Sequence, residues 1–280
     1  MFKNKLKFIL KNNKGILPSL PYILVALIFI VIPSILIVIK SFSPTSSGSI
    51  IENFNFINEY VWMKILKSIY IAIFATIICV LLSYPFAHFL AFCIKSKVSK
   101  SLIILLITAP IWMSFLIKIV GLKTLFDCIN GYQNSTFGDI FTILGLVYIY
   151  IPFMILPIYN VLEGMPRNIL FASHDLGRGS FYTFFKIVIP YTKTALFSGI
   201  TLVFLPSLTT VAVPQFLNKS SSGTMIGDII MEEGILAQIS DISLARASTL
   251  AFIISLIVFG CGTIYVVTKK IIKITKERNK

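Results

Sequence analysis

Residues that could carry out chemistry are scarce in this sequence, and they gather in one place. The segment ASHDLGRGSFYTFFKIVIP, residues 172–190, places His174, Asp175 and Arg178 between long uncharged runs. The four cysteines form no CxxC pair, and two histidines are too few for a His-based metal site. A membrane-embedded enzyme would need clusters of His, Asp or Glu in its apolar runs, where His88 stands alone. We therefore expect no metal site and no catalysis, and residues 172–190 become the segment to explain.

The composition indicates the environment in which this segment works. Of 280 residues, 56% are hydrophobic and 13% are charged, whereas soluble domains carry about 25% charged residues. Uncharged runs of about 18 residues or more predict membrane-spanning helices. We predict an all-α, polytopic membrane protein with six spans: Tyr22–Ile39, Ser68–Ile94, Ser101–Ile117, Ile140–Leu162, Thr194–Asn218 and Ala247–Thr268. The first run is longer than the apolar region of a signal peptide, so we expect it to be retained.

The charges predict the orientation of the spans. The chain has 25 Lys and Arg against 11 Asp and Glu. If both termini are cytoplasmic, most basic residues fall in inside segments and most acidic residues fall outside, as the positive-inside rule requires. The net charge of +14 then needs no nucleic-acid partner. We expect a basic cytoplasmic tail over residues 1–19, a membrane domain over 20–268 with a cytoplasmic loop at 163–193, and a second basic cytoplasmic tail over 269–280.

The loop at 163–193 has the pattern of two short helices. The first has an apolar face with helical spacing, formed by Ile169, Ala172, Ser173 and Leu176. Gly177 and Gly179 predict a turn, and Ser180 is a candidate N-cap for the second helix. The face predicted for that helix is Phe181, Phe184, Phe185 and Val188. Pro190 is expected to end or bend it.

This loop resembles the EAA loop of ABC importer permeases, whose pattern is EAA, three residues, Gly, nine residues and I-x-L-P. Ala172, Gly177 and Pro190 match that pattern, whereas Phe171 replaces its Glu and Ser173 its second Ala. The resemblance implies that the loop docks in a cleft of a cytoplasmic ATPase subunit. The residues it assigns to this coupling are Phe171, Ala172, Ser173, Asp175, Leu176, Gly177, Arg178 and Pro190.

A wider likeness covers roughly residues 20–268. The phrases that carry it are Tyr84–Ala87, Pro110-x-Trp112, Leu116-Ile117, Gly121–Lys123, Gly145–Ile149 and Pro152–Met154. They resemble the PotB-type membrane subunits of bacterial spermidine/putrescine importers. The resemblance implies the type I ABC importer fold in the bacterial inner membrane, with a second homologous permease, a dimer of cytoplasmic ATPase subunits and an extracytoplasmic substrate-binding protein as partners. ATP would be bound by the partner ATPase, since this chain has no Walker motif.

A polycation path needs carboxylates, carbonyl groups and aromatic faces. The fifth span holds Pro206 and Pro214, which predict a broken helix lining the path. Its side chains, with nearby aromatic and acidic residues, give the candidate path set: Trp112, Tyr148, Tyr150, Thr209, Thr210, Gln215 and Asp228. None of the six spans contains an acid, so charge compensation would come from a second subunit or from Asp139 or Asp228. Gln215 stands where polyamine permeases often carry an acid.

Other interpretations remain open at this point. The cargo of an ABC permease of this kind could instead be ferric iron, thiamine or sulfate, although a sulfate path would favour basic residues that the spans lack. An ungated channel or scaffold is a further alternative, but it would not require a structured loop.

Overall fold

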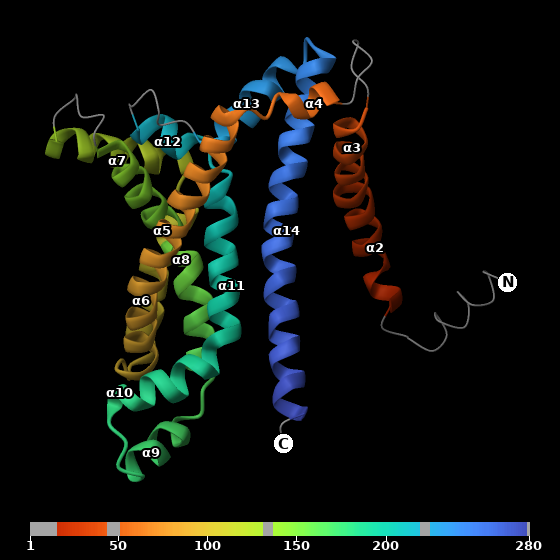
Figure 1. Ribbon diagram of the computed structural model, residues 1–280. Helices are drawn as coiled ribbons and strands as arrows, with labels where there is room; N and C mark the ends of the chain where they lie inside the picture. The colour runs from red at the N-terminus through yellow and green to blue at the C-terminus, as the bar shows by residue number, and fades with distance from the viewer. Residues whose placement is uncertain (1–15, 44–50, 131–136, 219–224, 279–280) are drawn as a thin grey trace. The chain divides into compact units, whose positions relative to one another are not determined.

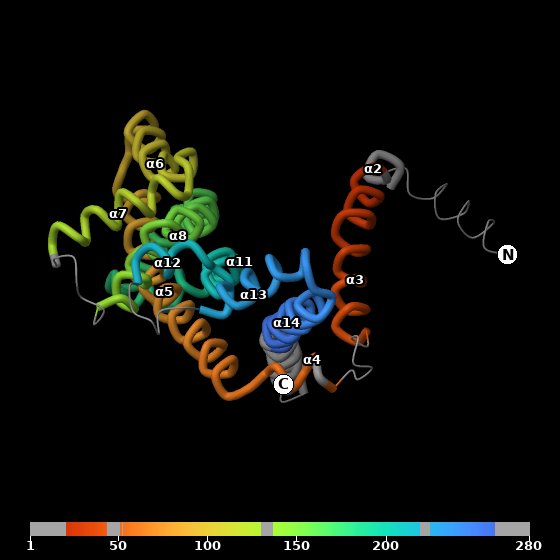
Figure 2. Tube along the Cα trace, turned by 90° about the horizontal axis from the view of Figure 1, so that it is seen from above, coloured from red at the N-terminus to blue at the C-terminus, as the bar shows by residue number. Residues whose placement is uncertain are grey.

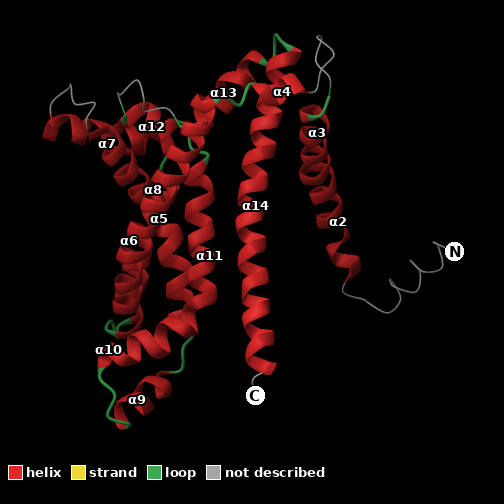
Figure 3. Ribbon diagram, in the orientation of Figure 1, coloured by secondary structure: helices red, strands yellow, loops and turns green. Residues whose placement is uncertain are grey.

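The computed structural model describes residues 16–43, 51–130, 137–218 and 225–278. Within these ranges every secondary-structure element is helical, which confirms the predicted all-α class (Figure 3). The elements in chain order are α2 (Ile16–Ala26), η1 (Leu27–Val31), α3 (Ile32–Ser41), α4 (Ile51–Asn55), α5 (Glu59–Phe92), α6 (Lys97–Trp112), α7 (Phe115–Asn130), α8 (Gly138–Glu163), α9 (Arg167–Asp175), α10 (Ser180–Thr183), η3 (Phe184–Val188), α11 (Ile189–Leu208), α12 (Ala212–Leu217), α13 (Ile226–Leu236) and α14 (Asp241–Arg278).

The chain divides into two compact units. One consists of residues 58–229 and holds α5 to α12 with the first turn of α13. The other consists of the residues before 58 and after 229, with α2 to α4, α14 and the rest of α13. The candidate coupling and path residues, 112 to 228, all belong to the first unit.

The core of the 58–229 unit lies where α5, α8 and α11 pack side by side (Figures 1 and 2). Ile71, Ala75 and Cys79 follow one another at four-residue spacing on α5 and are fully buried in this core. Gly199 allows α11 to approach α8, because a Cβ at that position would lie 2.7 Å from Sδ of Met154. Small residues at such crossings let the backbones of membrane helices approach closely. This packing matters because the hydrophobic effect contributes little to helix association within lipid.

The start of α5 is defined by local chemistry. The Asn58 side chain accepts a hydrogen bond from the Val61 N–H at 3.1 Å, and Glu59 lies in the first turn near the positive end of the helix dipole. The helix therefore begins nine residues before the predicted span at Ser68.

Among the described residues, five helical segments are long and apolar enough to cross a membrane, and one bent helix pair could form a sixth crossing. The prediction of one continuous span over Ser101–Ile117 is wrong. The α6 helix ends at Trp112, Met113 is extended, and α7 leaves at a bend of 97°. Pro110 lacks the N–H that would continue the hydrogen-bond ladder, and this weakens the last turn of α6.

The predicted fifth span is interrupted. Residues 209–211 separate α11 from α12, and Pro206 and Pro214 lie on the two sides of this break. The prolines thus bracket a broken helix as predicted, although α11 begins at Ile189, ahead of the predicted Thr194.

In the other unit α3 packs against α14, where the rings of Phe42 and Phe252 meet edge to face at 5.5 Å. The α14 helix continues to Arg278, beyond the predicted span end at Thr268, so the predicted C-terminal tail is helical over most of its length. Lysine is a good helix former, which explains why the end of the apolar run did not end the helix. Most of the predicted N-terminal tail, residues 1–19, lies outside the described residues.

Candidate functional site

Two regions at opposite ends of the 58–229 unit hold most of the candidate residues. The first, which we call the α9 loop, comprises residues 164–188 and lies at the end opposite α12 (Figure 1). Its helix α9 carries Phe171, which is 61% exposed, and ends next to Leu176, which is 80% exposed. Asp175 is also exposed. Large exposed apolar side chains on a short projecting helix are typical of a surface that meets a partner.

The turn after α9 is a Schellman motif built on a glycine. Gly177 has φ +72°, and its N–H donates to the His174 carbonyl at 2.8 Å. The Arg178 N–H reaches back to the Ser173 carbonyl at 3.1 Å, which completes the pair of hydrogen bonds that defines the motif. The Arg178 guanidinium then lies 4.6 Å from the ring centroid of Tyr182. Only glycine enters this backbone region without strain, so the predicted turn at Gly177 is present with a defined geometry.

A buried hydrogen bond closes the loop between its two helices. Ser173 Oγ and Thr183 Oγ1 lie 2.8 Å apart, and Thr183 Oγ1 also donates to the Gly179 carbonyl at 3.2 Å. The N-cap residue of α10 is Gly179, and no side chain caps this helix, so the prediction that Ser180 is the cap is wrong. The Thr183 hydroxyl bonds the Gly179 carbonyl instead and links the turn to the helix.

The second helix of the loop is joined to the core by one aromatic side chain. The Phe184 ring meets Tyr84 and His88 of α5 edge to face, each at 5.3 Å between centroids. The predicted single apolar face is split, because Phe184 and Val188 pack into the core while Phe181 and Phe185 are exposed. This split leaves an exposed aromatic pair at the side of the loop.

Pro190 does not end the helix. It lies in the first turn of α11, directly after the π-helical turn η3, in which the Ile189 N–H donates to the Phe184 carbonyl five residues earlier. The helical path from Ser180 to Leu208 therefore continues past the proline, and Figure 1 shows it changing direction between α10 and α11. Because Pro190 has no N–H, one carbonyl of the preceding turn lacks its usual helical donor.

A buried lysine joins three helices beside the loop. Lys100 of α6 donates to the Ala91 carbonyl at 3.0 Å and to both oxygens of Glu163, at 3.0 and 2.7 Å. Ala91 lies near the end of α5, and Glu163 is the last residue of α8 before the loop. The Tyr159 side chain also contacts the Glu163 carboxylate. The base from which the loop leaves is thus held by charge-assisted hydrogen bonds.

The second region, which we call the outer polar cluster, lies at the α12 end and consists of Lys64, Tyr150, Thr210, Gln215 and Asp228. The side chains of Tyr150 and Thr210 interact by a hydrogen bond, and the Gln215 amide and Lys64 ammonium act on the Asp228 carboxyl. Five separate segments supply these residues: α5, α8, the break at 209–211, α12 and α13. The structure therefore brings together four of the seven candidate path residues.

Asp228 is the acidic member of the cluster, and only 8% of its surface is exposed. Oδ2 accepts the Met225 N–H at 2.7 Å, whereas Oδ1 is buried without a hydrogen-bond partner among the described residues. Burial raises the pKa of this carboxyl, and the Met225 N–H, Gln215 and Lys64 each lower it in part.

Backbone contacts fix the position of the cluster. A Cβ at Gly227 would lie 2.6 Å from the Thr209 carbonyl oxygen and 2.8 Å from that of Thr210, so α13 begins directly against the break. The Ile226 N–H donates to Ser68 Oγ of α5 at 2.9 Å. The Thr209 carbonyl therefore borders the cluster.

Two candidate path residues lie outside the cluster. Trp112 is the last residue of α6, not the middle of a span, and is 84% exposed. Tyr148 is exposed on α8. Neither is packed into the outer polar cluster.

Sequence reasoning did not select Lys64 and Ser68 for the site. Both lie in the buried phase of α5, at the three- to four-residue spacing that continues through Ile71 and Ala75. A lysine in phase with the buried face of a helix was the available signal.

A second group of polar residues lies near the start of α8. Asp139 Oδ1 accepts from Lys67 Nζ at 2.8 Å and from Asn218 Nδ2 at 2.7 Å. Asp139, the other acid considered for charge compensation, is thus engaged within the protein.

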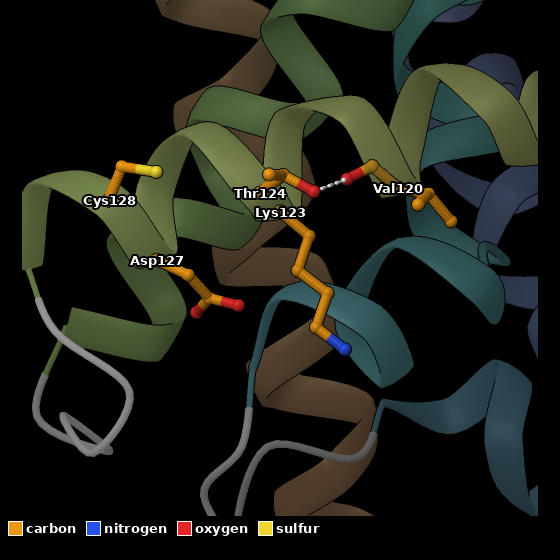
Figure 4. A pocket seen from close by; sticks show the side chains of 5 residues that line it. All are labelled: Val120, Lys123, Thr124, Asp127 and Cys128. Atoms are coloured by element: carbon orange, nitrogen blue, oxygen red, sulfur yellow. Dashed lines mark hydrogen bonds between the residues drawn. The ribbon is translucent and has the colours of Figure 1, made fainter.

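A pocket of about 490 Å³ opens along α7 (Figure 4). Its lining is Val120, Lys123, Thr124, Asp127 and Cys128, and the Thr124 hydroxyl bonds the Val120 carbonyl at 3.0 Å. The candidate path residues are not part of this lining, so the pocket and the outer polar cluster are separate features.

The fold has a close counterpart among solved structures. A bacterial ABC transporter that imports the acidic polysaccharide alginate contains a chain that matches with a TM-score of 0.65 at 15% identity, covering 91% of this chain and 95% of that chain. The two chains therefore share a fold, which agrees with the predicted ABC importer fold.

Relatives are found by sequence as well. A spermidine/putrescine transport system permease protein PotB homolog of Mycoplasma genitalium is 42% identical, covering 72% of this chain and 73% of the relative. PotB of Haemophilus influenzae is 31% identical over 75% of this chain and 77% of its own, and PotB of Escherichia coli is 36% identical over 59% and 64%. Residues 80–272 match the family described as binding-protein-dependent transport system inner membrane component. The chain therefore belongs to this family of transporter membrane subunits, which are permease components and not enzymes.

Proposed function

We propose that this chain is one of two permease subunits of an ATP-driven importer for polyamines, and that the α9 loop couples it to a cytoplasmic ATPase dimer. The observation that carries the coupling role is the α9 loop itself. It presents Phe171 and Leu176 outward and is joined to α5 through Phe184. A force on α9 would therefore reach the central helices through packed side chains.

The cargo is proposed from two further observations. The relatives named above are spermidine/putrescine permeases, at 31 to 42% identity. In addition, the position of Gln215, where polyamine permeases often carry an acid, lies beside the carboxyl group of Asp228. A different helix thus supplies the negative charge in the same neighbourhood, which supports a cationic cargo.

The partners and orientation follow from the same proposal. An importer of this class needs a second permease, two ATPase subunits and an extracytoplasmic binding protein. The basic residues gather in the segments on the α9 side of the spans, and this supports a cytoplasmic position for α9 and for both termini.

The cargo is tested by uptake of radiolabelled spermidine and putrescine in cells that lack this chain, with sulfate and thiamine as controls. We expect loss of polyamine uptake alone. Unchanged polyamine uptake would remove the cargo assignment.

The coupling role is tested separately by cross-linking. A cysteine at Leu176, in a chain without its native cysteines, should cross-link to the ATPase subunit, while a cysteine at Trp112 should not. Failure of Leu176→Cys to cross-link in an assembled, active complex would count against docking of α9.

A further inference from the structure

The carboxyl group of Asp228 is used only in part by the fold. Asp228 is the third residue of α13, and Oδ2 returns to the N–H of Met225, as in a capping box. Oδ1 is buried without a hydrogen-bond partner among the described residues. A buried acceptor with no partner is costly and rare in folded proteins, so its presence calls for an explanation.

A lysine of the protein itself supplies the positive charge that acts on the Asp228 carboxyl. Lys64 on α5 is 5% exposed, and its ammonium lies 5.2 Å from the ring centroid of Tyr60. Among the described residues, Lys64 is the charged side chain that acts on the Asp228 carboxyl. Gln215 also acts on this carboxyl, but its side chain is neutral. A buried lysine is retained where a counter-charge compensates it.

The site is held in place independently of any cargo. The first two N–H groups at the start of α13 are satisfied by Asp228 Oδ2 and by Ser68 Oγ, and Ser68 lies one turn after Lys64 on α5. The carboxyl and the ammonium are therefore both placed by the same junction between α5 and α13. Such preorganisation lowers the cost of binding a ligand there.

From these observations we propose that Lys64 is a tethered substitute for the cargo's terminal ammonium group: its charge acts on Asp228 in the absence of cargo, and an incoming primary ammonium takes over this role by binding Oδ1. The proposal rests on the proposed function, because the cargo class is that of the polyamines. A lysine side chain ends in the same primary ammonium group as an aliphatic polyamine. The exchange therefore conserves charge in the buried site.

The exchange also explains how a buried acid can bind a polyamine and still let it pass through the transporter. A carboxylate without a counter-ion would hold a polyamine strongly, whereas conduction requires that bound cargo can leave. When the Lys64 ammonium returns to Asp228, it displaces the ammonium group of the cargo. Lys64 thus sets both affinity and release, and Asp228 sets the preference for a cation.

The test uses the complete transporter in proteoliposomes at pH 8, with labelled putrescine and spermidine. The variant Asp228→Asn keeps an oxygen for the Met225 N–H and removes the charge. Its KM should rise about tenfold or more, the effect of losing one charge-assisted hydrogen bond. Lys64→Met should lower KM and slow the maximal rate, because no tethered group displaces the cargo.

A matched control is Lys67→Met, which removes the same charge from the same helix, but from a lysine paired with Asp139. Its KM should change less than that of Lys64→Met. In the double variant, Lys64→Met should have no effect on KM once Asp228→Asn is present, because the two residues then no longer interact. Thermal stability of each purified complex verifies that the variants assemble.

Three results would overturn the exchange: a wild-type KM in Asp228→Asn, a Lys64→Met effect equal to that of Lys67→Met, or additive effects in the double variant. These leave polyamine transport by the unmodified complex intact. If the unmodified complex moves neither polyamine, the cargo assignment fails first, and the exchange fails with it.

Discussion

Ser173 on α9 and Thr183 on α10 meet through their hydroxyl groups at 2.8 Å, across the glycine turn that separates the two helices. Both residues are buried, although they belong to a loop whose neighbouring side chains are exposed. The resemblance to the EAA loop would place alanine at 173. The serine therefore adds a polar link within the loop at the position where the usual pattern has only a small side chain.

The first prediction concerns this link. Ser173→Ala removes one hydrogen bond, and Thr183→Val also removes the bond to the Gly179 carbonyl, so each should cost about 0.5–1.5 kcal/mol per bond lost. The double variant should be little worse than Thr183→Val, because the two changes remove a shared interaction. Ser180→Ala is the control, since Ser180 makes no capping bond. Melting temperatures of the purified complex measure the effect, and strictly additive losses would show that the link contributes nothing.

The second prediction compares the two glycines of the turn. Gly177 has φ +72° and Gly179 has φ −67°, so only the first occupies the left-handed region. Gly177→Ala should destabilise the loop by about 1–2 kcal/mol and reduce ATP-driven uptake, whereas Gly179→Ala, which introduces no left-handed strain, should have a smaller effect. Gly177→Pro should abolish transport, because it also removes the N–H bonded to His174. Equal effects of the two alanine variants would argue against the turn geometry.

The third prediction concerns the lysine beside the loop. Lys100→Met removes the hydrogen bonds to Glu163 and to the Ala91 carbonyl and should lower stability by about 1.5–3 kcal/mol. Lys97→Met, on the exposed face of the same helix, should have little effect. The melting temperatures of the two complexes test this prediction. A Lys100→Met complex as stable as the wild type would show that the Lys100–Glu163 interaction does not stabilise the protein.

The fourth prediction concerns the start of α13. Gly227→Ala would place a Cβ 2.6 Å from a backbone carbonyl oxygen, and backbone cannot yield as a side-chain end does. The variant should weaken assembly and transport, whereas Gly234→Ala on the same helix meets nothing within 4 Å and should be tolerated. Expression level and uptake rate report the difference. A fully active Gly227→Ala protein would contradict the close packing of α13 on the break.

The fifth prediction concerns pH. Burial raises the pKa of Asp228 above its unfolded value, so ionisation of this carboxyl costs folding free energy above the folded pKa. Stability should therefore increase as pH falls through that pKa, while polyamine uptake, which needs the carboxylate, should decrease. Lys64 on α5 is the charged side chain that acts on the Asp228 carboxyl. Melting temperature and uptake are measured between pH 4 and 8.

The Asp228→Asn variant is the control for this experiment. It should lack both the stability change and the change in uptake over the same range. A wild-type protein whose uptake is as insensitive to acid as that of the variant would show that the charge on Asp228 is not used.

Periodicity and charge predicted the helical class and the positions of most spans, because lipid-facing helices must be uncharged over a fixed length. The break after Trp112 was missed, since the uncharged run continues through it while the backbone does not. The prolines at 206 and 214 did predict the break between them. Proline predicts such a break because it removes a backbone N–H from the helical hydrogen-bond ladder.

The outer polar cluster could be predicted only in part. Asp228, Gln215 and Thr210 were selected by type, but their contact with Lys64 and Tyr150 depends on how α5, α8 and α13 pack. The hydrogen bond from Ile226 to Ser68 joins positions 158 residues apart, and no local pattern reports such a contact. The single apolar face predicted over 181–188 was wrong, because Phe184 and Val188 pack into the core while Phe181 and Phe185 are exposed.

The π-helical turn η3 within this segment has a mechanical consequence. Its hydrogen bond spans five residues, so the turn holds one residue more than an α-turn, and each residue of an α-helix corresponds to about 100° of rotation. If the same residues were wound as a regular α-helix instead, the segment before this turn would be rotated by about that angle around the helix axis. The direction in which α9 projects is therefore set by the winding of this one turn.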